Sequence, residues 1–432
     1  MTDETSIQVG QEMHRFIADL YPICRSITGD GVRDTLQLIG KHIPLEIHEV
    51  PSGTKVFDWT VPKEWNIRDA YIKNSKGERV VDFKKSNLHV VSYSQPIDTK
   101  MTLGALKPYL HTLPEFPEWI PYRTSYYKES WGFCLTHKQF QAFQDEQYEV
   151  CIQSSLKIGS LTYGECVIPG DTPEEVLISA HVCHPSLCND NLSGIALATY
   201  LALKLKLEKS RYTYRFLFVP GTIGSIVWLA QNQKTTDRIR HGVVLTGVGD
   251  GGGFTYKKSR KGDAEIDRVF SHILKHAPWE HTIIDFFPYG YDERQYCSPG
   301  FNLPVGCLMR TPHGQYPEYH TSGDNLDIIR PEYLEQSFSV CLKSIGVLEE
   351  NKVYRSLNPF CEPQLGKRGL YRAIGGQAEG AKREMAMLWV LNLSDGDHSL
   401  LDIAERSNIS FEIISEAGKI LFEHHLLEEV RM

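Results

Sequence analysis

Residues 176–194 read VLISAHVCHPSLCNDNLSG, and this stretch decides the fold. It begins with a short apolar run, which predicts a buried strand. The apolar pattern then stops, and an Asn/Ser/Gly cluster leads into an apolar helix. His181 therefore ends a strand and Asp190 precedes a helix, at the sheet edge where open α/β proteins bind ligands. The two side chains are well placed to share one ion; the alternative is a His that caps the core and an Asp that caps the helix.

Strands and helices alternate outward from this stretch. Such alternation predicts βαβ units, and hence an α/β fold with a mostly parallel sheet covered by helices on both faces. The expected strands are 149–155, 160–167, 176–180, 214–219, 242–248, 283–287 and 305–309, and the expected helices are 192–205, 223–231, 264–276 and 331–349.

The N-terminal third of the chain has a different pattern. Residues 8–43 have helical periodicity, whereas short alternating segments predict strands from residue 45 onward. Aromatic residues become dense over 114–131. This region therefore forms a β-rich block between the first helices and the stretch at 176–194.

The C-terminal part begins with a Gly- and Pro-rich segment, 355–381, which we expect to be a linker. Three short helices follow within 382–432 and resemble a winged helix. Residues 382–432 contain ten acidic and five basic residues. Because DNA affinity comes largely from cations that meet phosphates, we expect a protein-contact or dimerisation module here, and possible self-association, rather than nucleic-acid binding.

Composition narrows the classes of function. The chain has 432 residues, enough for two or three domains, and a net charge of −8, which argues against nucleic-acid and anionic membrane partners. Residues 1–11 are polar, and no apolar run approaches the roughly 20 residues of a membrane-spanning helix. The ten Cys are scattered singly, which is typical of reduced thiols. We expect a cytoplasmic protein.

His181, the triplet 189–191 and the pair 193–194 resemble the first metal-binding segment of the co-catalytic dizinc aminopeptidases, whose zinc-exopeptidase fold glutaminyl cyclases share. In that family the His binds one zinc and the Asp bridges two. Over nearly its whole length the chain is more similar still to bacterial aminopeptidase-like proteins with a nested β-rich domain and a C-terminal winged helix. The resemblance implies four parts: a catalytic domain (1–48 and 148–354), an inserted β-rich domain (49–147), a linker (355–381) and a winged-helix-like domain (382–432).

Two later segments fit the resemblance. Residues 317–327 match the family's terminal His-Thr-x-x-Asp segment, which implies that His320 binds the second metal. Asp250, after the strand expected at 242–248, matches the carboxylate that completes the first zinc site. His181, Asp190, Asp250 and His320 form a nitrogen and oxygen set suited to zinc, and we expect all four at one site.

One segment departs from the family. The turn at 219–225 should carry two adjacent glutamates, a general base and a metal ligand, but Gly221 and Thr222 stand at those positions. Neither can supply a carboxylate. We therefore expect one tightly held zinc ion rather than two equal ones.

Other carboxylates are candidates for the missing role. Asp292 lies where relatives hold the amino end of the substrate, and Glu293, or after it Glu318, could act as general base. The alternative for 292–293 is a solvated acidic pair beside a turn. His184 is a further candidate ligand, and Cys183 stands where the family has an acid that supports the first His.

The sequence therefore predicts a zinc-dependent hydrolase of the aminopeptidase type, which cleaves a peptide or amide bond beside the free amino group of a peptide or aminoacyl substrate. The alternative is a metal-binding pseudoenzyme that recognises an amino compound, which the residue Gly221 favours. A transcription factor is disfavoured by the acidic C-terminal part.

Overall fold

The computed structural model describes residues 3–126, 128–370 and 378–430. The chain divides into two compact units. The larger comprises Met1–Ala264 and Thr282–Phe338, and the smaller comprises Glu265–His281 and Ser339–Met432. No helix in the described part of the chain is long and apolar enough to cross a membrane.

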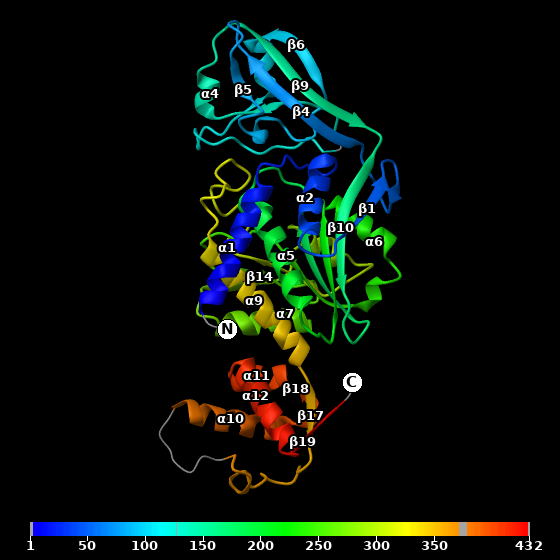
Figure 1. The fold of residues 1–432 in the computed structure, drawn as a ribbon, viewed down its shortest axis with the longest axis vertical. Coiled ribbons are helices and arrows are strands. Elements are labelled where there is room, and N and C mark those ends of the chain that lie inside the picture. Colours follow the sequence, from blue (N-terminus) through cyan, green and yellow to red (C-terminus); the bar gives the residue numbers. More distant parts are fainter. Residues whose placement is uncertain (1–2, 127, 371–377, 431–432) are drawn as a thin grey trace. The chain divides into compact units, whose positions relative to one another are not determined.

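The larger unit is built on an eight-stranded mixed sheet (Figure 1). Its central strands β12, β11, β13 and β16 are parallel, whereas β1, β10 and β14 run antiparallel to their neighbours. In spatial order the strands are β1 (Glu46–Pro51), β10 (Ser160–Ile168), β12 (Thr213–Val219), β11 (Glu175–His181), β13 (Ile239–Leu245), β16 (Val305–Met309), β14 (Phe254–Lys257) and β15 (His281–Ile284). The predicted α/β fold with a mostly parallel central sheet is confirmed.

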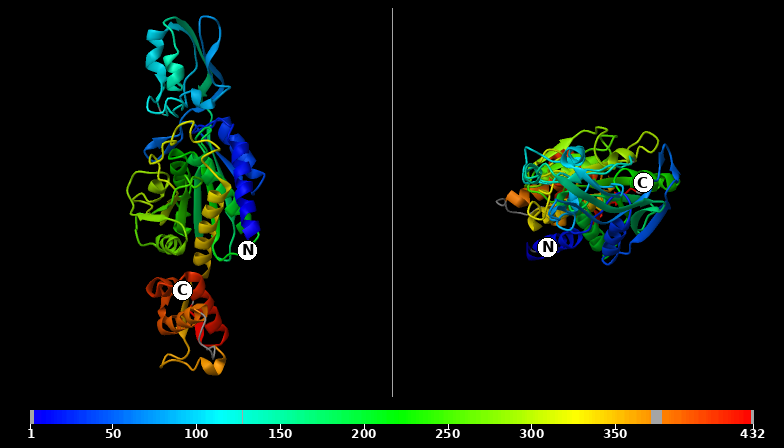
Figure 2. Two further views of the ribbon diagram at one scale, coloured as in Figure 1. Left: turned by 90° about the vertical axis from the view of Figure 1, so that its left-hand side faces the viewer. Right: turned by 90° about the horizontal axis from the view of Figure 1, so that it is seen from above.

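Helices cover both faces of this sheet (Figure 2). On β10, Gly164 faces Leu36, whereas the next residue, Glu165, accepts a hydrogen bond from Nε1 of Trp228. Successive strand residues point to opposite faces, so the helices that carry Leu36 and Trp228 lie on opposite sides. The helices of this part are α1 (Asp3–Leu20), α2 (Asp30–Gly40), α5 (Gly194–Leu205), α6 (Ile223–Gln231) and the short α8 (Glu293–Tyr296).

The β-rich block forms a second sheet in the larger unit, in the order β5-β4-β9-β6. Its strands are β4 (Glu64–Lys73), β5 (Arg79–Asp82), β6 (Ile97–Thr102) and β9 (Gln147–Lys157). Two small strand pairs accompany this sheet: β2 (Lys55–Val56) pairs with β3 (Trp59–Thr60), and β7 (Leu110–His111) pairs with β8 (Phe133–Cys134). The insert also contains the short helices α3 (Leu103–Leu106) and α4 (His137–Gln141). The expected boundary of the insert is residue 147. Residues 148–157 instead pair with β4 and β6, because β9 is the long strand that completes the insert's sheet.

The smaller unit contains the winged helix. Its three-stranded sheet has the order β18-β17-β19, with β17 (Val353–Ser356), β18 (Asp395–Ser399) and β19 (Leu427–Glu429). Its helices are α7 (Glu265–His276), the end of α9 (Pro331–Glu350), α10 (Ala378–Leu393), α11 (Leu400–Ser407) and α12 (Phe411–Glu423). The winged-helix sheet thus begins before the expected boundary at 382, since β17 precedes most of the predicted linker, 355–381. Part of that segment, 371–377, lies outside the described residues.

Candidate metal and active site

Three of the predicted ligands meet at the carboxyl end of the parallel strands. His181 is the last residue of β11, and Asp190 lies in the irregular turn Cys188–Ser193 that leads into α5. Nε2 of His181 is 3.0 Å from Oδ1 of Asp190, and Nε2 of His320 is 3.0 Å from its Oδ2. Both oxygens of a fully buried carboxylate thus face imidazole nitrogens.

His184 joins this group from the loop between His181 and Asp190. One ligand atom from each of His181, His184 and Asp190 lies within 4.8 Å of the others. Burial lowers the pKa of His184 to about 3, so its ring is neutral at pH 7. Burial acts to raise the pKa of Asp190, but the nearby His184 and the hydrogen bonds with His181 and His320 hold it well below its ordinary value. Imidazole nitrogens around a buried carboxylate form a ligand set that fits a zinc ion.

The hydrogen bond that orients the His181 ring comes from an amide and is weaker than the carboxylate–histidine contact of a carboxylate–histidine–zinc arrangement. Nδ1 of His181 lies 3.3 Å from the amide nitrogen of Asn191, which also donates to the carbonyl of Leu245. Cys183 is not turned to this ring: its sulfur accepts a hydrogen bond from the backbone N–H of Gly221 at 3.2 Å. Burial raises the pKa of Cys183 to about 12, so it is a neutral thiol.

The turn after β12 holds a carboxylate from another segment instead of a glutamate of its own. Asp292, one residue before α8, accepts through Oδ1 from the N–H of Thr222 at 2.7 Å and the hydroxyl of Ser225 at 2.8 Å. Oδ2 of Asp292 is buried and has no hydrogen-bond partner among the described residues. Burial raises the pKa of Asp292, which makes this carboxylate a stronger base.

Asp292 and two of the histidines line one cavity of about 200 Å³. The lining residues are Tyr126, His181, Cys183, His184, Gly221, Thr222, Gly290, Tyr291 and Asp292. This cavity therefore contains part of the imidazole group, the turn without glutamate and a single carboxylate side chain.

Glu293 and Glu318, the residues expected to act as general base, do not line this cavity. Glu293 is fully buried, with Oε1 2.5 Å from Nζ of Lys257. Lys257 also donates to the carbonyls of Phe287 and Tyr289. Glu293 thus fixes the loop that carries Asp292. Glu318 is half-buried, and its backbone carbonyl accepts from the N–H and hydroxyl of Thr321.

Both carboxylate oxygens of Asp250 are held by neighbouring groups of the protein, whereas those of Asp190 face imidazole nitrogens. β13 ends at Leu245 rather than at the expected residue 248, so Asp250 lies five residues beyond the strand. Its Oδ1 accepts from the hydroxyl of Thr311 at 2.6 Å and the N–H of Gly252 at 2.7 Å, and its Oδ2 accepts from the side chain of Asn189 at 2.8 Å. Asp250 therefore braces the turn that carries Asp190.

The insert contributes two aromatic residues, Tyr122 and Tyr126, that were not among the predicted site residues. Tyr122 donates its N–H to the carbonyl of His320 at 2.7 Å, and its ring meets the rings of His184 and His320 edge-on, each at 5.1 Å. Its hydroxyl lies 2.8 Å from that of Tyr126, which lines the cavity. In the sequence, only the aromatic density at 114–131 indicated that residues such as Tyr122 and Tyr126 pack against the site.

Comparisons with known proteins agree with this architecture. A family model described as a domain of unknown function (DUF4910) matches residues 14–351, and a winged helix-turn-helix model matches residues 352–429. A protein of Clostridium acetobutylicum, provisionally described as a polysaccharide biosynthesis protein with an aminopeptidase-like domain, is 56% identical over 427 residues, which cover 99% of this chain and 98% of that protein.

Two solved structures are also similar to this chain. A crystal structure from Clostridium acetobutylicum, provisionally described as a peptidase, has a TM-score of 0.95 and 54% identity, with 99% of this chain and 98% of that chain covered. A zinc aminopeptidase of Bacillus subtilis has a TM-score of 0.57 and 12% identity, with coverage of 78% and 94%, which shows the fold alone. This chain therefore belongs to the DUF4910 family, in which it combines an aminopeptidase-like fold with a C-terminal winged helix.

Proposed function

We propose that this protein is a zinc-dependent amide hydrolase of the aminopeptidase type. The observation that carries the proposal is the fully buried carboxylate of Asp190, which two imidazoles contact at 3.0 Å beside a cavity lined by a second carboxylate, Asp292. His181, Asp190 and His320 would hold the ion, with His184 next to them. A zinc ion bound there would polarise a substrate carbonyl and acidify a water molecule.

Asp292 is the residue that we assign to proton transfer. It is the one carboxylate side chain among the residues that line the cavity, and its Oδ2 has no hydrogen-bond partner among the described residues. Its raised pKa brings its proton affinity nearer to that needed at neutral pH. The hydrogen bonds from Thr222 and Ser225 hold Oδ1 and leave Oδ2 to take a proton.

A second candidate function rests on the same residue. A single carboxylate cannot at once accept a proton from water and hold the ammonium group of a substrate. If Asp292 binds an amine, the cavity lacks a base, and the protein recognises an amino compound without cleaving it. The absence of a glutamate at Gly221 favours this alternative.

The two candidates are separated by a metal analysis of the purified protein paired with a substrate screen. We expect one zinc ion per chain, since Gly221 and Thr222 add no second carboxylate. The screen covers aminoacyl amides and dipeptides and, because the Clostridium relative is described as a polysaccharide biosynthesis protein, aminoacyl amides of amino sugars. Turnover that a chelator abolishes and zinc restores supports the hydrolase; zinc and amine binding without turnover supports the recognition protein.

For the winged helix we propose a protein contact rather than DNA binding. α12 carries Glu412, Glu416 and Glu423 against Lys419, and Lys419 already pairs with Glu350 at 2.7 Å. A helix with this charge repels phosphates. Removal of 382–432 should alter the oligomeric state, and salt-sensitive binding of duplex DNA by the intact protein would contradict the proposal.

A further inference from the structure

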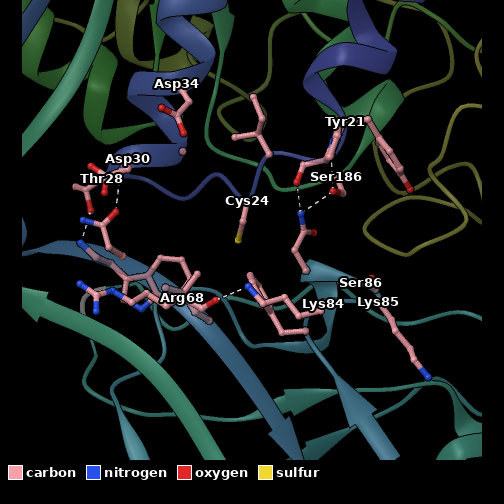
Figure 3. A pocket seen from close by; sticks show the side chains of 18 residues that line it. Tyr21, Cys24, Thr28, Asp30, Asp34, Arg68, Lys84, Lys85, Ser86 and Ser186 are labelled. Atoms are coloured by element: carbon pink, nitrogen blue, oxygen red, sulfur yellow. Dashed lines mark hydrogen bonds between the residues drawn. The ribbon is translucent and has the colours of Figure 1, made fainter. Parts of the chain in front are cut away.

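A larger cavity, of about 590 Å³, lies apart from the metal site and has no role in the proposed reaction. One wall comes from 21–34, which comprise the connection from α1 to α2 and the start of α2, and the other comes from 65–87 of the insert (Figure 3). Its volume falls in the range of about 300–1,000 Å³ that is typical of small-molecule sites.

Hydrogen bonds across this cavity fix its walls. Nδ2 of Asn87 in the insert donates to the hydroxyl of Ser186 at 2.7 Å, and that hydroxyl donates to the carbonyl of Tyr21 at 2.6 Å. On the opposite side, the N–H of Asp30 donates to Oδ1 of Asn66 in the insert at 2.7 Å. The cavity is therefore preformed, which lowers the entropic cost of ligand binding.

The two rims of the cavity carry opposite charges. Asp30 and Asp34 stand on the α2 wall, and Arg68 and Lys84 stand on the insert wall (Figure 3). Within the described residues no ion pair joins the rims: Asp30 pairs with Arg33 at 3.0 Å, and Lys84 donates to the backbone carbonyl of Arg68 at 2.7 Å. Asp34 and the guanidinium of Arg68 remain available to a ligand.

Part of the lining between the rims is apolar, and we call this part the floor. Cys24, Ile67 and Phe83 are half-buried there, and Trp65 is buried. Burial raises the pKa of Cys24 to about 12, so its thiol adds no charge. An apolar floor between a negative and a positive rim suits a molecule with an ammonium group, an apolar body and a carboxylate.

We propose that this cavity binds a zwitterionic ligand of the amino-acid or short-peptide class. The ammonium group lies on the side of Asp34, the carboxylate lies toward Arg68 and Lys84, and the apolar side chains cover the floor. This inference does not depend on the proposed hydrolysis, because the residues that line this cavity are separate from those that line the catalytic cavity.

The test is calorimetric titration of the full-length protein with leucyl-leucine, whose integrity is checked by chromatography after each run. The probes compared with it are the acetylated peptide, the peptide amide and the acetylated amide, which lack the ammonium group, the carboxylate or both. We expect a dissociation constant below about 1 mM for the zwitterion and affinities at least about tenfold weaker for each blocked peptide.

The variants Asp34→Asn and Arg68→Gln should each weaken the binding of leucyl-leucine by about tenfold or more. The matched controls Asp98→Asn and Lys100→Gln, exposed on β6 of the same insert, should change it by less than about twofold. Absence of binding at about 10 mM peptide would overturn the proposal. So would binding that both rim variants leave unchanged, or that Asp292→Asn removes, since either would place the peptide elsewhere.

Discussion

The turns that follow β11 and β12 lie side by side at one edge of the sheet, where His181 pairs in register with Val219, yet they contribute differently to the site. The turn after β11 supplies His181, His184 and Asp190. The turn after β12 supplies no carboxylate, and its backbone and hydroxyl groups hold Asp292 instead. In the proposed function, the metal ligands therefore come from the turn after β11, whereas the proton acceptor Asp292 comes from a distant segment.

The largest effect should come from the turn after β11. His181→Ala or His320→Ala removes an imidazole that contacts Asp190, and we expect loss of the zinc ion and of all turnover, because few donors then remain. Elemental analysis after dialysis measures this, with the exposed His281→Ala as control. Full zinc content in both variants would show that the ion, if bound, lies elsewhere.

A change at the turn after β12 should leave the metal in place. Asp292→Asn keeps an oxygen for Thr222 and Ser225 but removes the proton acceptor, so we expect a fall in kcat of about 10²–10⁴-fold at unchanged zinc content. Steady-state kinetics with the best substrate of the screen measures it. A raised KM at unchanged kcat would instead assign Asp292 to the ammonium group of the substrate.

Replacement of Glu293, the residue next to Asp292, should lower stability rather than kcat. Glu293→Gln leaves the buried ammonium of Lys257 without its charged partner, and removal of one member of a buried pair costs about 3–5 kcal/mol of stability. Urea unfolding measures the loss. The double variant Glu293→Gln with Lys257→Met should recover part of it, because no buried charge then stays unpaired. If the Glu293→Gln protein were stable but had a low kcat, Glu293 rather than Asp292 would be the general base.

These adjacent residues show where inference from the sequence ends. Hydrophobic runs and parallel strand ends brought His181 and Asp190 together, and the resemblance of residues 317–327 to the family's terminal segment added His320. Which of two consecutive acids faces a cavity depends on the turn before α8, and residue types do not encode that orientation. The position of Asp250 relative to β13 was not predicted for a similar reason: the chain leaves β13 at Leu245, three residues before the apolar pattern ends.

The insert was harder to predict than the sheet. Its strands followed from alternation, but Tyr122 and Tyr126, which contact the site, lie 59 and 55 positions before His181 in sequence. Aromatic density indicated packing there without indicating the partner. Long-range contacts between a loop and a sheet edge have no periodic signature in either segment.

The smallest predicted effect is on stability, and it concerns the glycine that replaces a glutamate in the turn after β12. A Cβ at Gly221 would lie 3.3 Å from the sulfur of Cys183 and 3.6 Å from Cβ of His181, so Gly221→Ala requires a shift of a few tenths of an ångström. At Gly224 a Cβ would lie 2.7 Å from Cδ of Pro220 and 2.9 Å from Cβ of Val219, which cannot be relieved by a side-chain rotation alone.

We therefore expect Gly221→Ala to change the free energy of unfolding by less than about 1 kcal/mol and Gly224→Ala to lower it by about 1–3 kcal/mol, measured by urea unfolding of both variants. That outcome would mean that the turn has room for a side chain at 221, so packing does not explain the glycine. Equal destabilisation by both variants would mean that Cys183 and His181 leave no room there. The carboxylate would then come from Asp292 because no side chain at 221 fits beside the metal group.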